Sequence, residues 1–516
     1  MTNEGKAPAP PAASSITLAA ARAWVHALAG DPRARGHALG DYVARANRTA
    51  MPVAERLEFL EAVRGAALHA LIDLDTLLGS AAHPLNIDDR AALFTSRKLA
   101  TEMATAYQLA IAQWPAAATK ARPPIAPALL QAMQFAADVL LASFRSYTRV
   151  PDGAWKRLHA IYALAETHGV ATGIADAATR RSIAEAYAEV LLLAVTDPYR
   201  FAPGETDRVL AMLRRLRAPA SLTREPPASR PSGHFIVAGD LDQPPRSALL
   251  GDEDTGGTNW RFLDANAAVD RLREALDALE AGQSPPALAS WAPAAAREAA
   301  RRLVRLWEDP PHRVFRRDAA SGSVAICVGV KPIAHFVAHD ASGEEDHAAL
   351  RDRLTMPLHA LPEDEAGRLI PIHEWNVVNL SAGGMKVRRT ASTSHPIAVG
   401  EIVGIKTPGK PLWTIGATRW ITAQDDGTTE FGVQFFAEAA CAVWMKRPSP
   451  AVPPTLAILV TFAEEDRAGE ALLAPPGSFA PGLEIEVRGE GLRYRAQAGE
   501  AIERNAYFDL FRIDVI

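Results

Sequence analysis

The sequence predicts a multidomain α+β protein: an all-α N-terminal region, either a helical bundle or a stack of helical hairpins, then a C-terminal antiparallel β-barrel with an additional β-rich end. Two observations support this prediction. From about Ser15 to Arg217, apolar residues recur at three- and four-residue steps, as on one face of a helix. From His312 onward the period changes to two, which is typical of half-buried strands.

The helical region has regular apolar stripes and breaks where a helix should end. In RLEFLEAVRGAALHALIDLDTLL, one face collects Leu57, Leu60, Val63, Ala67, Leu71 and Leu74. PAAATKARPPIAP cannot continue a helix because of its prolines. VPDG offers Asp152 as an N-cap before Trp155, and Gly169 suits a helix C-terminus.

The β region contains many short strand candidates joined by Gly, Asp and Asn turns. They are SVAICVGV, WNVVNL, MKVRR, EIVGIKT, LWTIGATRWIT and FGVQFF. Such spacing predicts a small antiparallel barrel. After KRPSPAVPP, further strands such as TLAILVTF and LEIEVRG predict either a second barrel or an extension of the first.

Composition shifts divide the chain into five parts. We expect a disordered leader at 1–14, a helical domain at 15–217, a linker with a short strand and helices at 218–310, a barrel at 311–447 and a β-rich end at 454–516. The leader has no apolar signal-peptide core, and no window reaches the length of a membrane span. We therefore expect a cytoplasmic protein without a membrane span.

The composition excludes several classes of function. The 516 residues carry a net charge of -5, which argues against sequence-independent binding of nucleic acid. The two cysteines, Cys327 and Cys441, lie in apolar strand-like runs, so we expect buried free thiols in a reducing compartment.

Two motifs resemble functional sites, but each lacks residues that the site requires. Gly404, Gly409 and Lys410 match part of a phosphate-binding loop, but proline replaces the required Ser or Thr and a strand follows instead of a helix. His335 and His339 lie four residues apart, but no further ligand completes a zinc site. No nucleophile or acid–base motif is present, so we predict no catalytic residues, no metal site and no enzyme activity.

Two polar features of the β region point to an anionic ligand. In NLSAGGMKV, Asn379 and Ser381 offer an amide and a hydroxyl beside a glycine turn, although an ordinary hairpin uses the same residues. Just before the first strand lie Arg313, Arg316 and Arg317, whose guanidinium groups can fork onto phosphate oxygens and the guanine edge.

These features resemble the PilZ domain, a family of bacterial receptors for cyclic di-GMP. Arg313-x-x-x-Arg317 is similar to the family's RxxxR motif, and Asn379-x-Ser381-x-x-Gly384 to its [D/N]xSxxG motif. ATRWI and FGVQF match later strands of the barrel. The resemblance covers about 311–445, a quarter of the chain.

The resemblance implies a PilZ-like barrel and a set of ligand-binding residues. Arg313 and Arg317 would grip the phosphates and guanine edges of cyclic di-GMP, and Arg316 would assist. Asn379 and Ser381 would bond a guanine or a phosphate oxygen, and Gly384 would keep the turn open. One departure is a long insertion, about 331–370, expected to project between the first two barrel strands.

The preferred interpretation is a cytoplasmic second-messenger receptor that binds cyclic di-GMP and relays binding to an unidentified protein partner through its helical region. The arginine segment, mobile without ligand, would become ordered as it wraps the dinucleotide. The alternative is a degenerate PilZ scaffold that binds proteins and no nucleotide. A third class, an enzyme regulated by the barrel, has no support in the sequence.

Overall fold

A computed structural model of the chain describes two compact units. The first comprises residues 1–81 and 85–312, and the second comprises 82–84 and 313–516. The residues whose structure is described are 17–79, 81–114, 125–217, 221–227, 232–250, 259–308, 318–340, 371–390, 396–437, 440–448, 452–464, 467–489 and 492–516. The predicted disordered leader lies outside them.

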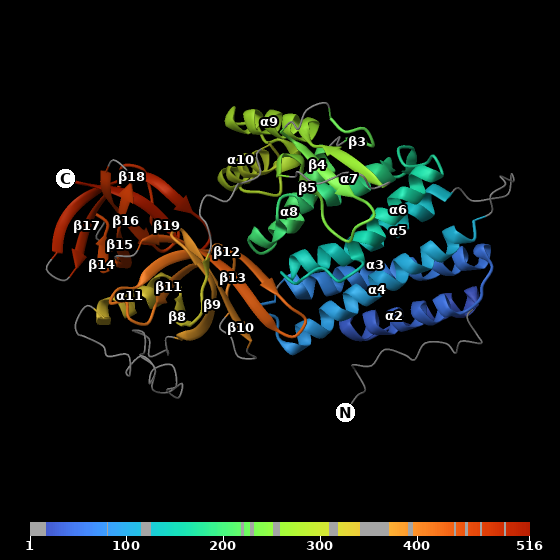
Figure 1. Cartoon of the computed structure of the whole chain (residues 1–516), viewed down its shortest axis with the longest axis horizontal. Helices are drawn as coiled ribbons and strands as arrows, with labels where there is room; N and C mark the ends of the chain where they lie inside the picture. The colour runs from blue at the N-terminus through green and yellow to red at the C-terminus, as the bar shows by residue number, and fades with distance from the viewer. Residues whose placement is uncertain are drawn as a thin grey trace. The chain divides into compact units, whose positions relative to one another are not determined.

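The N-terminal part of the first unit is helical, as predicted (Figure 1). Its helices are α1 (Leu18–His26), α2 (Pro32–Arg48), α3 (Val53–Gly79), α4 (Ile87–Ala112), α5 (Ile125–Arg145), α6 (Ala154–Thr167), α7 (Ile183–Ala194) and α8 (Glu205–Leu216). Of the described helices, α5 alone is long and apolar enough to cross a membrane, and 67% of its most apolar stretch is buried inside the molecule. Burial on nearly all sides is what a central core helix requires.

Capping of α6 differs from the prediction. The residue before the helix is Gly153, with φ +85, and Asp152 provides no side-chain cap. Instead, the carboxylate of Asp242, far along the chain, accepts hydrogen bonds from the backbone N–H groups of Gly153 and Lys156. A tertiary contact thus replaces the local cap, since either satisfies the free N–H groups of a first turn. Gly169, with φ +67, ends the helix as expected.

A small sheet and two helices complete the first unit. The strands are β3 (Ser221–Thr223), β4 (His234–Ala238), β5 (Arg246–Ser247) and β6 (Trp260–Asp264), in the order β3-β6-β4-β5, and the helices are α9 (Asn266–Glu280) and α10 (Pro293–Glu308). Phe235, Val237 and Leu263 belong to the same apolar core as the helices α1–α8. The stretch predicted as a linker with one short strand and helices therefore packs into the helical unit.

The second unit opens with a closed six-stranded antiparallel barrel, which confirms the predicted barrel. Its strands are β8 (Ser323–Val328), β9 (His373–Ser381), β10 (Gly384–Thr390), β11 (Ile402–Lys406), β12 (Thr414–Ala423) and β13 (Thr428–Ala437). They follow the order β10-β13-β12-β11-β8-β9, and pairing of β10 with β9 closes the ring. A two-residue strand, β7 (Asp318–Ala319), adds to β9.

The β-rich end forms a second closed barrel, which decides between the two alternatives that the sequence left open. Its strands are β14 (Ala440–Lys446), β15 (Thr455–Glu464), β16 (Arg467–Ala474), β17 (Glu484–Gly489), β18 (Leu492–Arg504) and β19 (Asp509–Val515), in the order β14-β15-β16-β19-β18-β17. Its interior is filled by aliphatic residues with Phe511.

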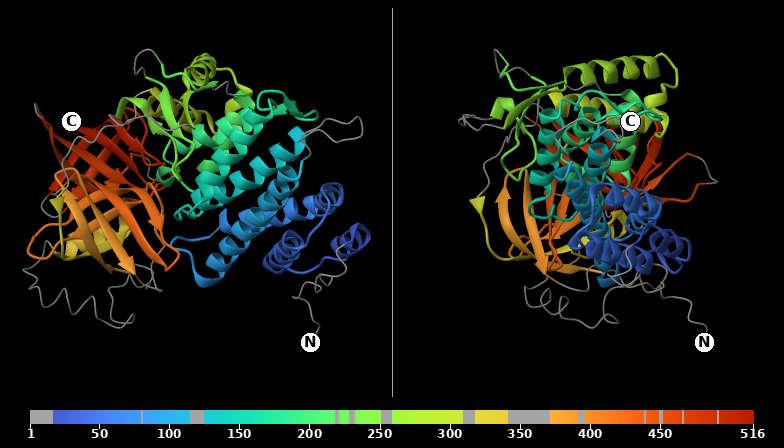
Figure 2. Two further views of the ribbon diagram at one scale, coloured as in Figure 1. Left: turned by 45° about the vertical axis from the view of Figure 1, so that its right-hand side comes forward. Right: turned by 90° about the vertical axis from the view of Figure 1, so that its right-hand side faces the viewer.

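A helix at the start of the predicted insertion packs between the two barrels (Figures 1 and 2). This helix, α11 (Val330–Asp340), follows β8 directly. Its Ile333 and Phe336 share one core with Ile415 of the first barrel and with Ile458 and Leu473 of the second. The described part of the insertion therefore does not project outward as expected, because its apolar face is buried. Residues 341–370 lie outside the described part of the chain.

The prediction for the cysteines was half right. Both are free thiols, and Cys327 is buried on β8. Cys441, the second residue of β14, is exposed, and the buried residues of this strand come after it.

Candidate functional site

The hairpin between β9 and β10 holds three of the predicted site residues. Asn379 and Ser381 lie at the end of β9, and Gly384 begins β10. The hydroxyl of Ser381 donates a hydrogen bond to the carbonyl of Gly384 at 3.1 Å. A Cβ on Gly384 would lie 2.1 Å from the carbonyl oxygen of Val433 on β13. The hairpin therefore requires glycine at this position for packing alone.

The remaining predicted residues, Arg313, Arg316 and Arg317, lie outside the described residues. The strand that follows them in sequence, β7, is paired with β9 at the polar turn. Asp318 is the cross-strand partner of Leu380, and Ala319 is the partner of Asn379. Asp318, which directly follows the arginine segment in sequence, therefore lies beside the end of β9, because neighbouring strands lie about 4.8 Å apart.

Four residues form a row across the outer face of four adjacent strands. Asn379 on β9 pairs with Lys386 on β10, Lys386 pairs with Gly432 on β13, and Gly432 pairs with Trp420 on β12. Directly opposed residues in an antiparallel sheet point to the same face. Both sequence neighbours of Lys386 are buried, so Lys386 and its row face outward.

The indole of Trp420 lies against the backbone of β13 at Gly432. A Cβ at Gly432 would come within 2.0 Å of the indole Nε1, so glycine leaves the space that the ring occupies. The ammonium of Lys386 is 5.8 Å from the centre of the ring. The indole is half-buried, which leaves part of an aromatic surface open on the outside of the barrel.

The charges beside this row leave a net positive charge, which favours an anion. Lys386 and Arg388 both contact Glu430, at 2.7 and 2.5 Å, so two cations share one carboxylate. Burial would raise the pKa of Glu430, but hydrogen bonds from Lys386 and Arg388 outweigh it and lower that pKa. The carboxylate therefore stays ionised, and one positive charge remains for an anionic ligand.

Asn379 carries an unsatisfied acceptor at the centre of this region. Its Oδ1 is buried and accepts no hydrogen bond from the described residues. Leaving such an oxygen unpaired costs about 1–3 kcal/mol. An N–H donor, from a guanidinium or from a guanine edge, would satisfy it.

Sequence reasoning found the hairpin but missed Lys386 and Trp420 as members of one surface. Trp420 was noted only as part of a strand motif. Its position in the same row as Asn379 follows from the register of three strand pairs, which includes irregular pairing in β12 and β10. An outward-facing tryptophan in an otherwise apolar strand was the available signal.

Comparison with known proteins agrees with this architecture. Two family models match: the N-terminal domain of the cyclic-di-GMP receptor FimW over residues 19–228, and the middle PilZ domain of FimW over residues 234–353 and 346–441. The chain belongs to the PilZ-domain family.

A curated relative extends the similarity beyond single domains. The chain is 23% identical over 504 residues to the "Cyclic-di-GMP receptor FimW" of Pseudomonas aeruginosa, and the match covers 87% of this chain and 82% of the relative. No solved structure matches the chain. The PilZ model begins at β4, and so includes β4, β5 and β6 of the small sheet of the first unit as well as the PilZ barrel.

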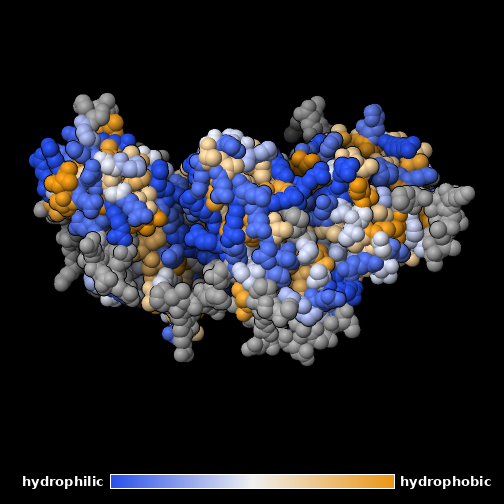
Figure 3. All heavy atoms as spheres, turned by 90° about the horizontal axis from the view of Figure 1, so that it is seen from above, coloured by the Kyte–Doolittle hydropathy of each residue, from blue (hydrophilic) through white to orange (hydrophobic). Residues whose placement is uncertain are grey.

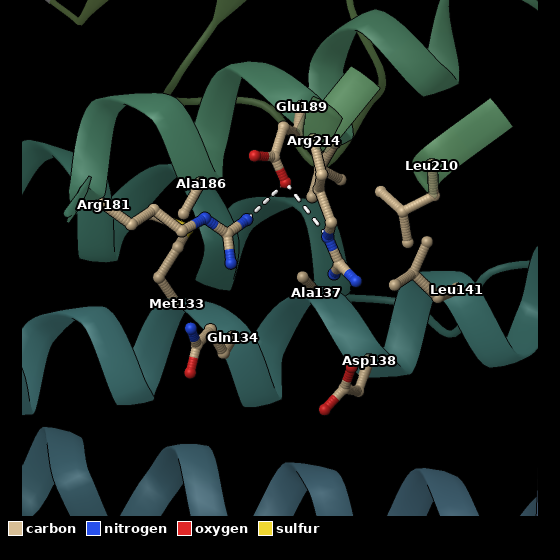
Figure 4. A pocket seen from close by; sticks show the side chains of 11 residues that line it. Met133, Gln134, Ala137, Asp138, Leu141, Arg181, Ala186, Glu189, Leu210 and Arg214 are labelled. Carbon is tan, nitrogen blue, oxygen red and sulfur yellow. Dashed lines mark hydrogen bonds and ion pairs between the residues drawn. The ribbon is translucent and has the colours of Figure 1, made fainter. Parts of the chain in front are cut away.

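A second polar cluster lies outside the PilZ barrel, among α5, α7 and α8 (Figure 4). Glu189 contacts both Arg181 and Arg214 beside a cavity of about 30 Å³. Burial and the nearby Asp75 raise the pKa of Asp138, which lines the cavity, to about 7. The cavity has room for about one or two water molecules and not for a nucleotide.

A groove of ligand size lies between α1 and α3 in the helical unit. Its volume is about 540 Å³, within the range of ligand pockets. Val25, Leu28 and Ile72 give it apolar walls, and an ion pair between Arg35 and Asp73 lies at its edge. Within the part of the chain that the structure describes, no cluster of His, Cys, Asp or Glu could hold a metal ion.

Proposed function

We propose that the chain is a cytoplasmic receptor that binds cyclic di-GMP on the outer face of the PilZ barrel. In this proposal Arg313 and Arg317 grip the phosphates and guanine edges, with Arg316 assisting. Asn379 and Ser381 bond a guanine or a phosphate oxygen, and Gly384 keeps the turn open. The relative's description as a cyclic-di-GMP receptor and the order of the motifs support this function.

The pairing of β7 with β9 is the observation on which the proposal depends. Arg317 precedes Asp318 directly in sequence, and Asp318 is the partner of Leu380, between Asn379 and Ser381. The long insertion lies between β8 and β9, so it does not separate the arginine segment from the turn along the sheet. This pairing supports the proposal that the arginines and the polar acceptors of the turn serve one site.

The described side chains suggest what each would contribute. The Oδ1 of Asn379, which accepts no hydrogen bond from the described residues, suits the N–H groups of guanine. Ser381 already donates its proton to Gly384, so its oxygen would face the ligand as an acceptor. Trp420 offers a flat surface for a purine, and stacking of a base on an aromatic side chain contributes about 1–3 kcal/mol.

The proposal describes a binding protein and not an enzyme. Its output is a change passed to a protein partner through the helical region. The groove between α1 and α3, with Ile72 60% exposed, is a surface on which such a partner would bury apolar area. An Ile72→Asp substitution should then abolish partner binding while leaving the affinity for cyclic di-GMP unchanged.

Calorimetric titration of the full chain with cyclic di-GMP tests the ligand. We expect saturable binding that Arg313→Ala/Arg317→Ala weakens by at least about 100-fold, because each charge-assisted hydrogen bond contributes about 1.5–3 kcal/mol. The control is Arg297→Ala/Arg305→Ala on α10. Hydrophilic residues cover much of the face of the molecule seen in Figure 3. Within the described residues these two arginines pair with no carboxylate, so the control removes the same charge without loss of binding.

Two outcomes would reject the receptor. The first is the absence of binding heat at micromolar ligand with folded protein. The second is equal binding by the wild type and the Arg313/Arg317 variant. Either result would favour the scaffold, in which Ser381 and Gly384 serve only the hairpin that they already form.

A further inference from the structure

The two barrels are joined by an ion pair at the edge of the candidate site. Arg419 on β12 directs Nη1 to Oε1 of Glu503 at 2.7 Å and Nη2 to Oε2 at 2.6 Å. Glu503 lies on β18 of the second barrel. Two parallel bonds of this kind hold a guanidinium and a carboxylate in one plane.

The same guanidinium is connected to the hairpin. Its Nε donates to Oε1 of Gln434 at 2.8 Å, and Gln434 is the cross-strand partner of Gly384, which in turn pairs with Ser381. Arg419 also directly precedes Trp420 in sequence. An anion that covers the hairpin and the indole would therefore lie beside Arg419.

Arg419 retains hydrogen-bonding capacity. A guanidinium has five N–H groups, and three of them are used by Glu503 and Gln434. The other two have no acceptor among the described residues. The side chains of Arg419 and Glu503 are 25% and 23% exposed, so the pair is reachable from solvent.

The pair is also the part of the barrel contact that can change. The contact also includes an apolar core around α11, with Phe336 and Phe508, and a hydrogen bond from Asn505 to the carbonyl of Gly400. Separating that core would expose a large apolar area, whereas a partly exposed ion pair contributes at most about 1 kcal/mol. Exchange of Glu503 for a phosphate on Arg419 would thus occur without separating the barrels.

We propose that Glu503 of the second barrel competes with the anionic ligand for Arg419, so that ligand binding releases Glu503 and changes the edge of the second barrel. This inference rests on the proposed binding of cyclic di-GMP. In this inference the second barrel helps to set the affinity of the first barrel for cyclic di-GMP. Release of Glu503 would also break its hydrogen bond with Asn505. The side chain of Asn505 donates both to Glu503 and to the carbonyl of Gly400 on the first barrel.

Titration of Glu503→Gln with cyclic di-GMP tests the competition. The amide keeps the shape and one acceptor but removes the competing charge. We expect the Kd to fall about fivefold, the equivalent of about 1 kcal/mol for a partly exposed pair. Glu486→Gln is the matched control, because Glu486 pairs with Arg488 and Arg493 of its own barrel. The control should leave the Kd unchanged.

A double-mutant cycle separates competition from a general effect on folding. In the Arg419→Lys background, which keeps the charge without the planar fork, the effect of Glu503→Gln should shrink to less than about twofold. Hydrogen exchange at the end of β18 should rise when ligand is added to the wild type and stay constant in Glu503→Gln.

The outcomes distinguish this inference from the proposed function. If the wild type binds and Glu503→Gln binds equally or more weakly, competition is rejected while the receptor stands. A weaker Glu503→Gln would mean that Glu503 positions Arg419 for the ligand. If the wild type does not bind at all, the receptor itself fails and the competition fails with it.

Discussion

Gly384→Ala separates a packing role from a ligand role at a predicted site residue. The added Cβ would lie 2.1 Å from the carbonyl oxygen of Val433, about 1.3 Å short of the 3.4 Å at which ordinary contact begins. The nearest atoms all belong to the backbone of β13, so no side chain can move aside. Overpacking costs about 1–3 kcal/mol, and each strained ladder hydrogen bond about 1 kcal/mol more. We expect the local stability of β10 and β13 to fall by about 2–4 kcal/mol.

Hydrogen exchange of the amides of β10 and β13, measured in increasing urea, checks this value. Gly65→Ala on α3 is the opposite case: a Cβ there meets nothing within 4 Å, and alanine in an exposed helix should stabilise it by about 0.5–1 kcal/mol. If Gly384→Ala keeps the exchange of the wild type and loses only cyclic di-GMP, the packing argument is refuted. The glycine would then serve the ligand directly.

Three further predictions concern other residues. Trp420→Ala should weaken binding of cyclic di-GMP about 5- to 150-fold by calorimetry, because it removes base stacking, and Trp420→Phe should recover part of that affinity. Burial raises the pKa of Asp138 from 3.8 to about 7, so the folded state keeps a proton that the unfolded chain has released; its stabilisation is full below pH 3.8 and is lost as the pH rises to about 7. The Tm of Asp138→Asn should therefore exceed that of the wild type at pH 8 by more than at pH 5, and equal differences would contradict the assignment. Glu166→Ala leaves the guanidinium of Arg261, 1% exposed, without its carboxylate and should cost about 3–5 kcal/mol in thermal unfolding, whereas Glu166→Gln should cost less.

Long periodic segments were predictable because burial of one face fixes their pattern. The stripe from Leu60 to Leu74 lies inside α3, and the alternating runs form the two barrels. The small sheet of the first unit was not predictable in full. Its strands have two to five residues, too few for a period to show, and β3 and β6 pair across 36 intervening residues.

The candidate site was predictable only where its residues are close in sequence. Asn379, Ser381 and Gly384 form one hairpin, which a local motif can specify. Lys386 and Trp420 join it through strand pairing, and a bulge in β12 shifts the register beside Trp420. The cap of α6 failed for the same reason, because Asp242 reaches it from another part of the chain. A local motif can therefore specify a hairpin, but it cannot specify groups that arrive from distant parts of the chain.

The position of α11 bears on how this chain can be divided for experiments. Its Ile333 and Phe336 are fully covered only because both barrels contribute to the same apolar cluster. A gene fragment ending before β14 would leave that side of the helix open to water and prone to self-association. The smallest soluble fragment that keeps the proposed ligand site should therefore run from the arginine segment to the C-terminus.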